Sequence, residues 1–115
     1  MRVTSSLWVA AHVRRWNGEG MPAVVVRRGA EEAGAIFVIV DRLDGTNDFY
    51  APAPQTEFSE EGVSDRRFER VGERLDALHI GEAIERELRF DPDIWVVAIE
   101  DRQGRSLLDT VAPRA

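Results

Sequence analysis

The stretch FVIVDRLDGTNDF, Phe37–Phe49, has an apolar run, a polar centre that contains glycine, and a return to apolar residues. Its centre holds Asp44 and Gly45, a strong signal for a tight hairpin turn, because both central residues of a type I′ turn need positive φ. The run that leads into it, Ala35–Val40, is apolar at every position. We therefore expect a central strand that is covered on both sides, followed by an antiparallel return strand.

A second stretch, WVVAIEDRQGRSL (Trp95–Leu107), repeats this pattern. Here DRQG is expected to turn the chain, with Gly104 in the left-handed region. The following residues, RSLLD (Arg105–Asp109), are then expected to return as a strand. Two similar hairpins are too few copies to indicate a repeat architecture.

Two other stretches have helical spacing. The first, TSSLWVAAHVRRWNGEG, begins at Thr4, and Thr4 or Ser5 can cap the helix. The second is ALHIGEAIERELRF (Ala77–Phe90); Gly81 weakens its first turn, and the Asp91-Pro pair ends it. The residues expected on the buried faces are Val9, Val13 and Trp16 in the first helix, and Ile80, Ile84 and Leu88 in the second.

Further short strands are expected at Pro22–Gly29, where three valines are consecutive, at the return from the first hairpin, and at residues 66–71. The order is α-β-β-β-(β)-α-β-β. We therefore predict one α+β domain over residues 1–115, with a mainly antiparallel sheet of about five to six short strands and two helices on one face. Residues 51–65 are expected to be a flexible loop, and residues 110–115 a frayed tail.

Composition limits the class of protein. Of the 115 residues, 43% are hydrophobic and 31% are charged, which is typical of a globular domain. The chain has no cysteine, which excludes disulfides, thiolate nucleophiles and cysteine-ligated metals. The apolar stretch near the N-terminus, Leu7–Ala11, is too short for a signal peptide or a membrane helix. We expect a cytoplasmic protein without a membrane partner.

The charge is uneven along the chain. The net charge is −6, yet residues 1–30 contain five arginines and one acid. The remaining residues contain twice as many acids as arginines, and they would repel a phosphate backbone. This distribution argues against nucleic acid as a partner.

The two hairpins also gather acids, and two interpretations compete. These acids are Asp41, Asp44 and Asp48 in the first hairpin, and Glu100 and Asp101 in the second. Paired carboxylates can perform acid–base chemistry or hold a hard cation when they converge. However, Arg42 and Arg102 lie among them, and turns favour aspartate and glycine for backbone reasons alone. We favour the turn interpretation.

His12 lies four residues from both Trp8 and Trp16, so one helix face reads Trp-His-Trp. This face either holds a planar or anionic ligand or is a packed tryptophan pair with a partly exposed histidine. His79 and Glu82, spaced i and i+3, make only two ligands of a metal site, and we expect no metal and no cofactor.

Several blocks of the chain are similar to a known family. These blocks are MRVTSSLWVAA, VVRRGAEEAGAIFV, RLDGTNDFYAPAPQ, SDRRFE and RELRFDPDIWVVAIEDR. Together they resemble a small bacterial family, domain of unknown function 1491, over nearly the whole chain. RRGAEEAGAIFV and RFDPDIWVV are the most specific of them. The resemblance implies a stand-alone, single-domain bacterial protein, and it assigns no functional residue.

Two functions fit these observations. The first is a binding or interaction module without catalytic activity, which uses exposed tryptophan and arginine to bind a protein partner or a second copy of itself. Its candidate residues are Trp8, His12, Arg14 and Arg15. The second is a small enzyme or metal-dependent hydrolase that uses Asp91, Asp93 and Glu100. We prefer the module, because the sequence offers no nucleophile, base and electrophile in combination.

Overall fold

A computed structural model describes residues 3–54 and 66–112 and contains two helices and five strands. In chain order, these elements are α1 (Ser5–Gly18), β1 (Ala23–Arg27), β2 (Ile36–Asp41), β3 (Asn47–Pro52), β4 (Phe68–Leu75), α2 (Ala77–Phe90) and β5 (Trp95–Glu100). The α+β class and both helices are as predicted. Thr4 caps α1 through its side chain, and Asp76 caps α2 in the same way.

The five strands form one sheet in the order β1-β5-β2-β3-β4. Neighbouring strands are antiparallel except β2 and β5, which run parallel in the register Ile36↔Trp95 through Asp41↔Glu100. Because β5 is inserted between β1 and β2, the loop that joins β1 to β2 is not a hairpin turn. The sheet is mainly antiparallel, as predicted, and α2 carries the chain from one edge back to its centre.

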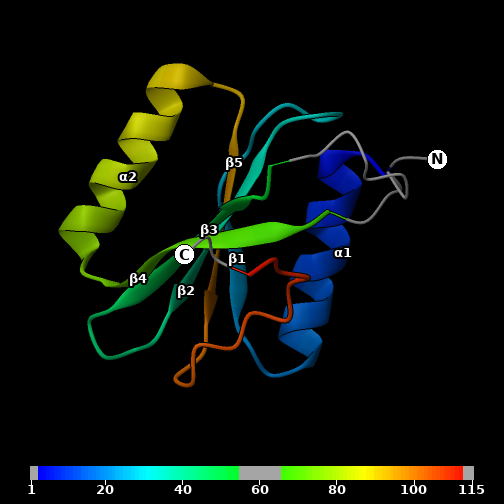
Figure 1. The fold of residues 1–115 in the computed structure, drawn as a ribbon. Helices are drawn as coiled ribbons and strands as arrows, with labels where there is room; N and C mark the ends of the chain where they lie inside the picture. The colour runs from blue at the N-terminus through cyan, green and yellow to red at the C-terminus, as the bar shows by residue number, and fades with distance from the viewer. Residues whose placement is uncertain (1–2, 55–65, 113–115) are drawn as a thin grey trace.

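The prediction that both helices lie on one face is wrong, because α1 and α2 cover opposite faces of the sheet (Figure 1). Side chains of β2 alternate between the two cores: Ile36 and Val38 pack with α1, whereas Phe37 and Ile39 pack with α2. All four are buried, which confirms that this strand is covered on both sides. A strand that is apolar on both faces requires one layer on each face.

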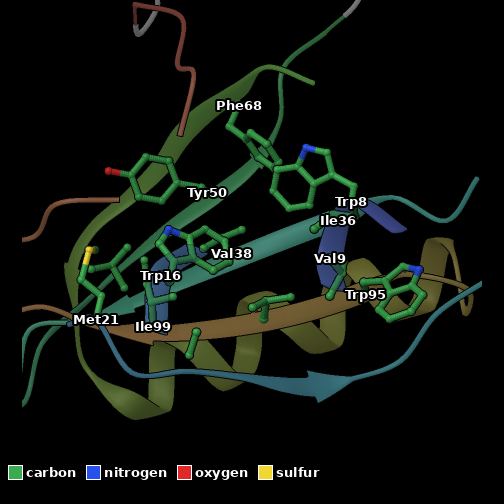
Figure 2. Close-up of a cluster of buried hydrophobic side chains, with 13 residues drawn as sticks. Trp8, Val9, Trp16, Met21, Ile36, Val38, Tyr50, Phe68, Trp95 and Ile99 are labelled. Atoms are coloured by element: carbon green, nitrogen blue, oxygen red, sulfur yellow. The ribbon is translucent and has the colours of Figure 1, made fainter. Parts of the chain in front are cut away.

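The larger core lies between the sheet and α1 (Figure 2). Val9 and Trp16 are buried as predicted, and Val13 is partly buried against them. In Figure 2 the ring of Trp8 lies beside Phe68 from β4, and their centroids are 5.4 Å apart. The smaller core, under α2, includes Ile80 from the predicted face.

The hairpin between β2 and β3 is present, but its loop is longer than the predicted two-residue turn. The last paired residues are Asp41 and Asn47, which leaves five residues between them. Positive φ occurs at Leu43 and Gly45, at 63° and 88°, rather than at Asp44 and Gly45. The loop is closed by the Arg42 backbone N–H, which donates to the Thr46 carbonyl at 3.0 Å.

We predict that Gly45→Val destabilises the fold by about 1 kcal/mol or more, because a β-branched residue is strained at positive φ. An added Cβ at this position would meet no neighbour within 4 Å, so the loss reports mainly the strain of the backbone. Chemical denaturation of both proteins measures it. An unchanged free energy of unfolding would show that the loop does not need glycine.

The second predicted hairpin does not form. The chain turns at Gly104, whose φ is 75°, but residues 105–109 are not a strand. Both edges of β5 are already occupied by β1 and β2, so a return strand has no edge to pair with. Instead, Leu107 and Leu108 pack against the α1 core.

The segment that follows Gly104 runs along α1 and β4 up to the end of the described residues. The Trp16 indole donates to the Ser106 carbonyl at 2.7 Å, which holds the segment against α1. Further along, Phe68 donates to the Asp109 carbonyl and accepts from the Val111 N–H, each at 2.9 Å. These bonds place Val111 beside β4, whereas residues 113–115 of the tail predicted to fray lie outside the described residues. Most of the predicted loop at residues 51–65 also lies outside them.

The loop Gly29–Gly34 and the turn before β5 are docked on each other. The backbone N–H of Ala30 donates to the Asp93 carbonyl at 3.0 Å, and the Trp95 indole donates to the Ala30 carbonyl at 2.8 Å. From the other side, the Ser5 hydroxyl donates to the Gly34 carbonyl at 2.6 Å. These contacts bring the two blocks RRGAEEAGAIFV and RFDPDIWVV side by side in the fold.

Candidate functional site

The acids of the first hairpin have structural partners. Asp48 is fully buried, and one of its carboxylate oxygens accepts from Arg42 Nε and Nη2 at 3.1 and 2.8 Å. Its other oxygen accepts from the Arg74 backbone N–H at 2.9 Å, which ties β3 to β4. Asp41 and Asp44 accept from backbone N–H groups two residues ahead, in the manner of turns.

Asp101 plays a similar part in the second loop. It is 7% exposed and accepts from the Arg105 backbone N–H at 2.7 Å and from the Arg105 guanidinium at 2.7 Å. The guanidinium hydrogen bonds hold the pKa of Asp101 below its ordinary value. The two acid clusters are therefore turns and ion pairs, and the turn interpretation is the one that the geometry fits.

The structure does not bring Asp91, Asp93 and Glu100 together. Asp91 and Asp93 precede β5, and Glu100 is its last residue. Six residues, most of them in β5, separate Asp93 from Glu100, a distance of roughly 20 Å along extended chain. Among the residues that the structure describes, no group of three or more histidines and acids is placed to hold a metal ion. His79, one half of the weak metal pair considered above, instead bonds to Asp76 at 2.7 Å.

A hollow lies along α1, where the C-terminal segment passes beside the helix. We call it the α1 groove; it has a volume of about 570 Å³. Its lining residues are Val3, Leu7, Trp8, Ala11, His12 and Arg15 from the N-terminal part of the chain, together with Arg66, Leu107, Leu108 and Asp109. The lining combines apolar side chains with the charged residues Arg15, Arg66 and Asp109.

Trp8 and His12 form one wall of the α1 groove. Their rings are stacked with centroids 3.7 Å apart and an interplanar angle of 14°. Trp8 is 7% exposed and Trp16 is fully buried, as the packing interpretation predicts, so Trp8 is not a protruding aromatic anchor. Only a small part of the Trp8 side chain is therefore accessible from the groove.

The hydrogen bonding of His12 defines what it presents to a ligand. Its Nδ1 lies 3.0 Å from the Trp8 carbonyl oxygen, which can only accept, so Nδ1 carries the proton. The neutral ring then keeps Nε2 as an acceptor. Burial lowers the pKa of His12 from its ordinary value, and the positive charge of Arg15 lowers it further against the opposing effect of the Trp8 bond. The neutral ring is therefore the form at pH 7.

Arginine gives the α1 groove its positive charge. Arg15 is exposed and lines the groove, whereas its neighbour Arg14 is exposed but does not line it. Arg66 donates to the Val3 carbonyl at 3.0 Å. The one acid in the lining, Asp109, faces Arg67 at 3.6 Å. Arg15 therefore gives the groove an exposed guanidinium in a chain that is acidic as a whole.

Of the four candidate residues for partner binding, the structure places Trp8, His12 and Arg15 in the α1 groove and leaves Arg14 outside it. Sequence reasoning missed the opposite wall, formed by Leu107 and Leu108, because these residues read as part of a returning strand. No signal in the sequence marks this role, because the strands that occupy both edges of β5 are known only from the sheet order.

The chain matches a known protein family over most of its length. A family model described as a protein of unknown function, DUF1491, matches residues 3–109. The chain belongs to the DUF1491 family. A search of curated proteins found no match.

Solved DUF1491 structures and a close neighbour share the architecture. A solution structure of a protein from A. tumefaciens is 42% identical, with a TM-score of 0.84 over 100% of both chains. A crystal structure of a DUF1491 family protein from Caulobacter crescentus is 35% identical, with a TM-score of 0.75 over 96% of this chain and 99% of that one. In the described part of this DUF1491 chain, no helix has the length and apolar character needed to cross a membrane.

Proposed function

We propose that this DUF1491 protein is a cytoplasmic binding module without catalytic activity, and that its α1 groove holds an acidic, partly apolar segment of a protein partner. The observation that carries this proposal is that the exposed apolar side chain of Leu7 and the exposed guanidinium of Arg15 line the same hollow. The chain as a whole has a net charge of −6, so a hollow lined by an exposed arginine differs from its average character.

The groove offers three kinds of contact. Leu7 is 60% exposed and, with Leu107 and Leu108, provides apolar surface for an aliphatic or aromatic side chain. The Arg15 guanidinium can bind a carboxylate with two parallel hydrogen bonds. The Nε2 of neutral His12 accepts one hydrogen bond, which suits a backbone amide N–H. An acidic peptide with an apolar residue supplies all three partners.

The pair Arg15 and Arg14 provides a matched test of the groove. We predict that Arg15→Glu weakens binding of a labelled peptide of alternating glutamate and leucine by about tenfold, equivalent to 1.4 kcal/mol. Arg14→Glu makes the same change of net charge one residue away but outside the groove, and it should weaken binding much less. Fluorescence anisotropy measures both affinities, and thermal melts check that the exposed substitutions leave folding intact.

Salt dependence and a reversed peptide complete the experiment. Binding should weaken as salt rises, because the Debye length falls from about 10 Å at 0.1 M to about 3 Å at 1 M. A peptide with lysine in place of glutamate should not bind. If the acidic peptide does not bind the wild type at low salt, or if both arginine variants weaken it equally, the α1 groove is not the recognition surface.

A further inference from the structure

Strand β1 is an edge of the sheet and is unusually apolar for one. Its central residues, Val24, Val25 and Val26, are 60%, 37% and 56% exposed. Within residues 3–54 and 66–112, β1 pairs only with β5, so its outer edge has no strand neighbour. Natural edge strands usually carry charges or prolines along their length, because a bare apolar edge pairs with other strands.

The uncovered valines follow from where α2 lies. Val24 pairs with Ala98, which belongs to the α2 face of the sheet. However, α2 packs over β3 and β4, which lie towards the opposite edge of the sheet from β1 (Figure 1). The α2 face of β1 therefore has no helix above it, and Val24 remains exposed.

We propose that β1 pairs antiparallel with β1 of a second copy of this chain, which joins the two sheets into one continuous sheet. The two-fold axis passes through Val25, so each Val24 lies opposite the Val26 of the other copy. This inference does not depend on the α1 groove, which is formed by other residues.

The charges at the two ends of β1 favour this alignment. Arg27 and Arg28 follow the valines, and in the antiparallel pair Arg27 lies opposite Ala23 of the other copy. A parallel pair would instead place each arginine beside its own equivalent. At the Ala23 end, Glu100 is exposed and is held next to Pro22 by a 2.9 Å bond from its backbone N–H to the Pro22 carbonyl. Arg28 of one copy, whose guanidinium lies 5.0 Å from the ring centroid of its own Trp95, and Glu100 of the other are then two strands apart, roughly 10 Å between backbones, and their opposite charges favour this alignment.

The irregularity in β1 limits how far the pairing extends. The register to β5 shifts between Val25 and Arg27, which leaves Val26 as the extra residue of a bulge. Pairing between copies is therefore restricted to a short apolar segment. We expect a dimer that dissociates on dilution rather than a permanent one.

A single cysteine tests the geometry, because the chain has no other. Residues directly opposite in an antiparallel pair have Cα atoms about 4.5–5.5 Å apart, a spacing that a disulfide can bridge. Val25→Cys, treated with oxidised glutathione, should therefore form a disulfide-linked dimer. The control Leu78→Cys places a thiol on α2, where the residue is 67% exposed, and should stay monomeric under the same conditions.

Sedimentation tests the association without any cross-link. Wild-type mass should rise with concentration towards a dimer, whereas Val24→Lys combined with Val26→Lys should remain at the 12.9 kDa of one chain. Leu78→Lys and Arg15→Glu should behave as the wild type. The proposal is overturned if the wild type is monomeric at every concentration, if the lysine variant still dimerises, or if Val25→Cys cross-links no better than Leu78→Cys.

Discussion

Asp48→Ala is expected to lower the free energy of unfolding by about 3–5 kcal/mol, the cost of breaking a buried ion pair by removal of one partner. Asp48 is fully buried, and Arg42 against it is only 10% exposed. The substitution leaves the Arg42 guanidinium without its carboxylate and removes the acceptor of the Arg74 N–H. In thermal melts we expect a fall in Tm of about 15 °C.

Asp44→Ala is the matched control, because Asp44 belongs to the same loop but is exposed and bonds mainly to Thr46. Its loss should be much smaller than that of Asp48→Ala. Equal losses for the two variants would show that the buried pair contributes nothing beyond the turn itself. An Asp48→Ala protein that keeps the wild-type Tm would return this carboxylate to consideration as a functional group.

Gly29→Ala is expected to cost about 3 kcal/mol, because the added Cβ collides with backbone that cannot move freely. That atom would lie 2.6 Å from the carbonyl carbon of Ile94 and closer still to the Asp93 oxygen. The φ of Gly29 is not positive, so the requirement is for space rather than for a left-handed conformation. The result would measure how tightly the Gly29–Gly34 loop docks on the turn before β5.

Gly81→Ala provides the contrasting result. Gly81 lies in the exposed first half of α2 with nothing within 4 Å of an added Cβ, and alanine is the better helix former there. We expect a gain of up to about 1 kcal/mol. Chemical denaturation of both variants should therefore give changes of opposite sign. A Gly29→Ala protein as stable as the wild type would contradict the docking described here.

The pattern of apolar and polar residues predicts the individual helices and strands, because neighbouring residues in the chain determine where these form. The stretch Ala35–Val40 has no polar position, which requires cover on both faces, and the structure has it. The order of the strands in the sheet does not follow from such local patterns. Gly29–Gly34 reads as a turn between adjacent strands, yet it connects strands separated by β5. Residue preferences in a short loop do not encode which strand is inserted between its two ends.

In the candidate site, too, one part could be predicted from the sequence and another part could not. The spacing of Trp8, His12 and Arg15 places them on one helix face, and all three line the α1 groove. The opposite wall comes from Leu107 and Leu108, about a hundred residues further along the chain. Their apolar pattern fits a strand equally well, and only the occupied edges of β5 exclude that outcome. A groove made from distant segments requires the tertiary structure.

The central claim is that the α1 groove is the recognition surface of this chain. The most direct measurement is a titration of isotope-labelled protein with the glutamate–leucine peptide, followed by two-dimensional NMR. The account predicts shifts at the backbone of His12, Arg15 and Leu107 and at the Trp8 indole, with the Trp95 indole unchanged. Shifts centred on the Asp48 loop or the Asp101 loop, or no shifts at all, would contradict it.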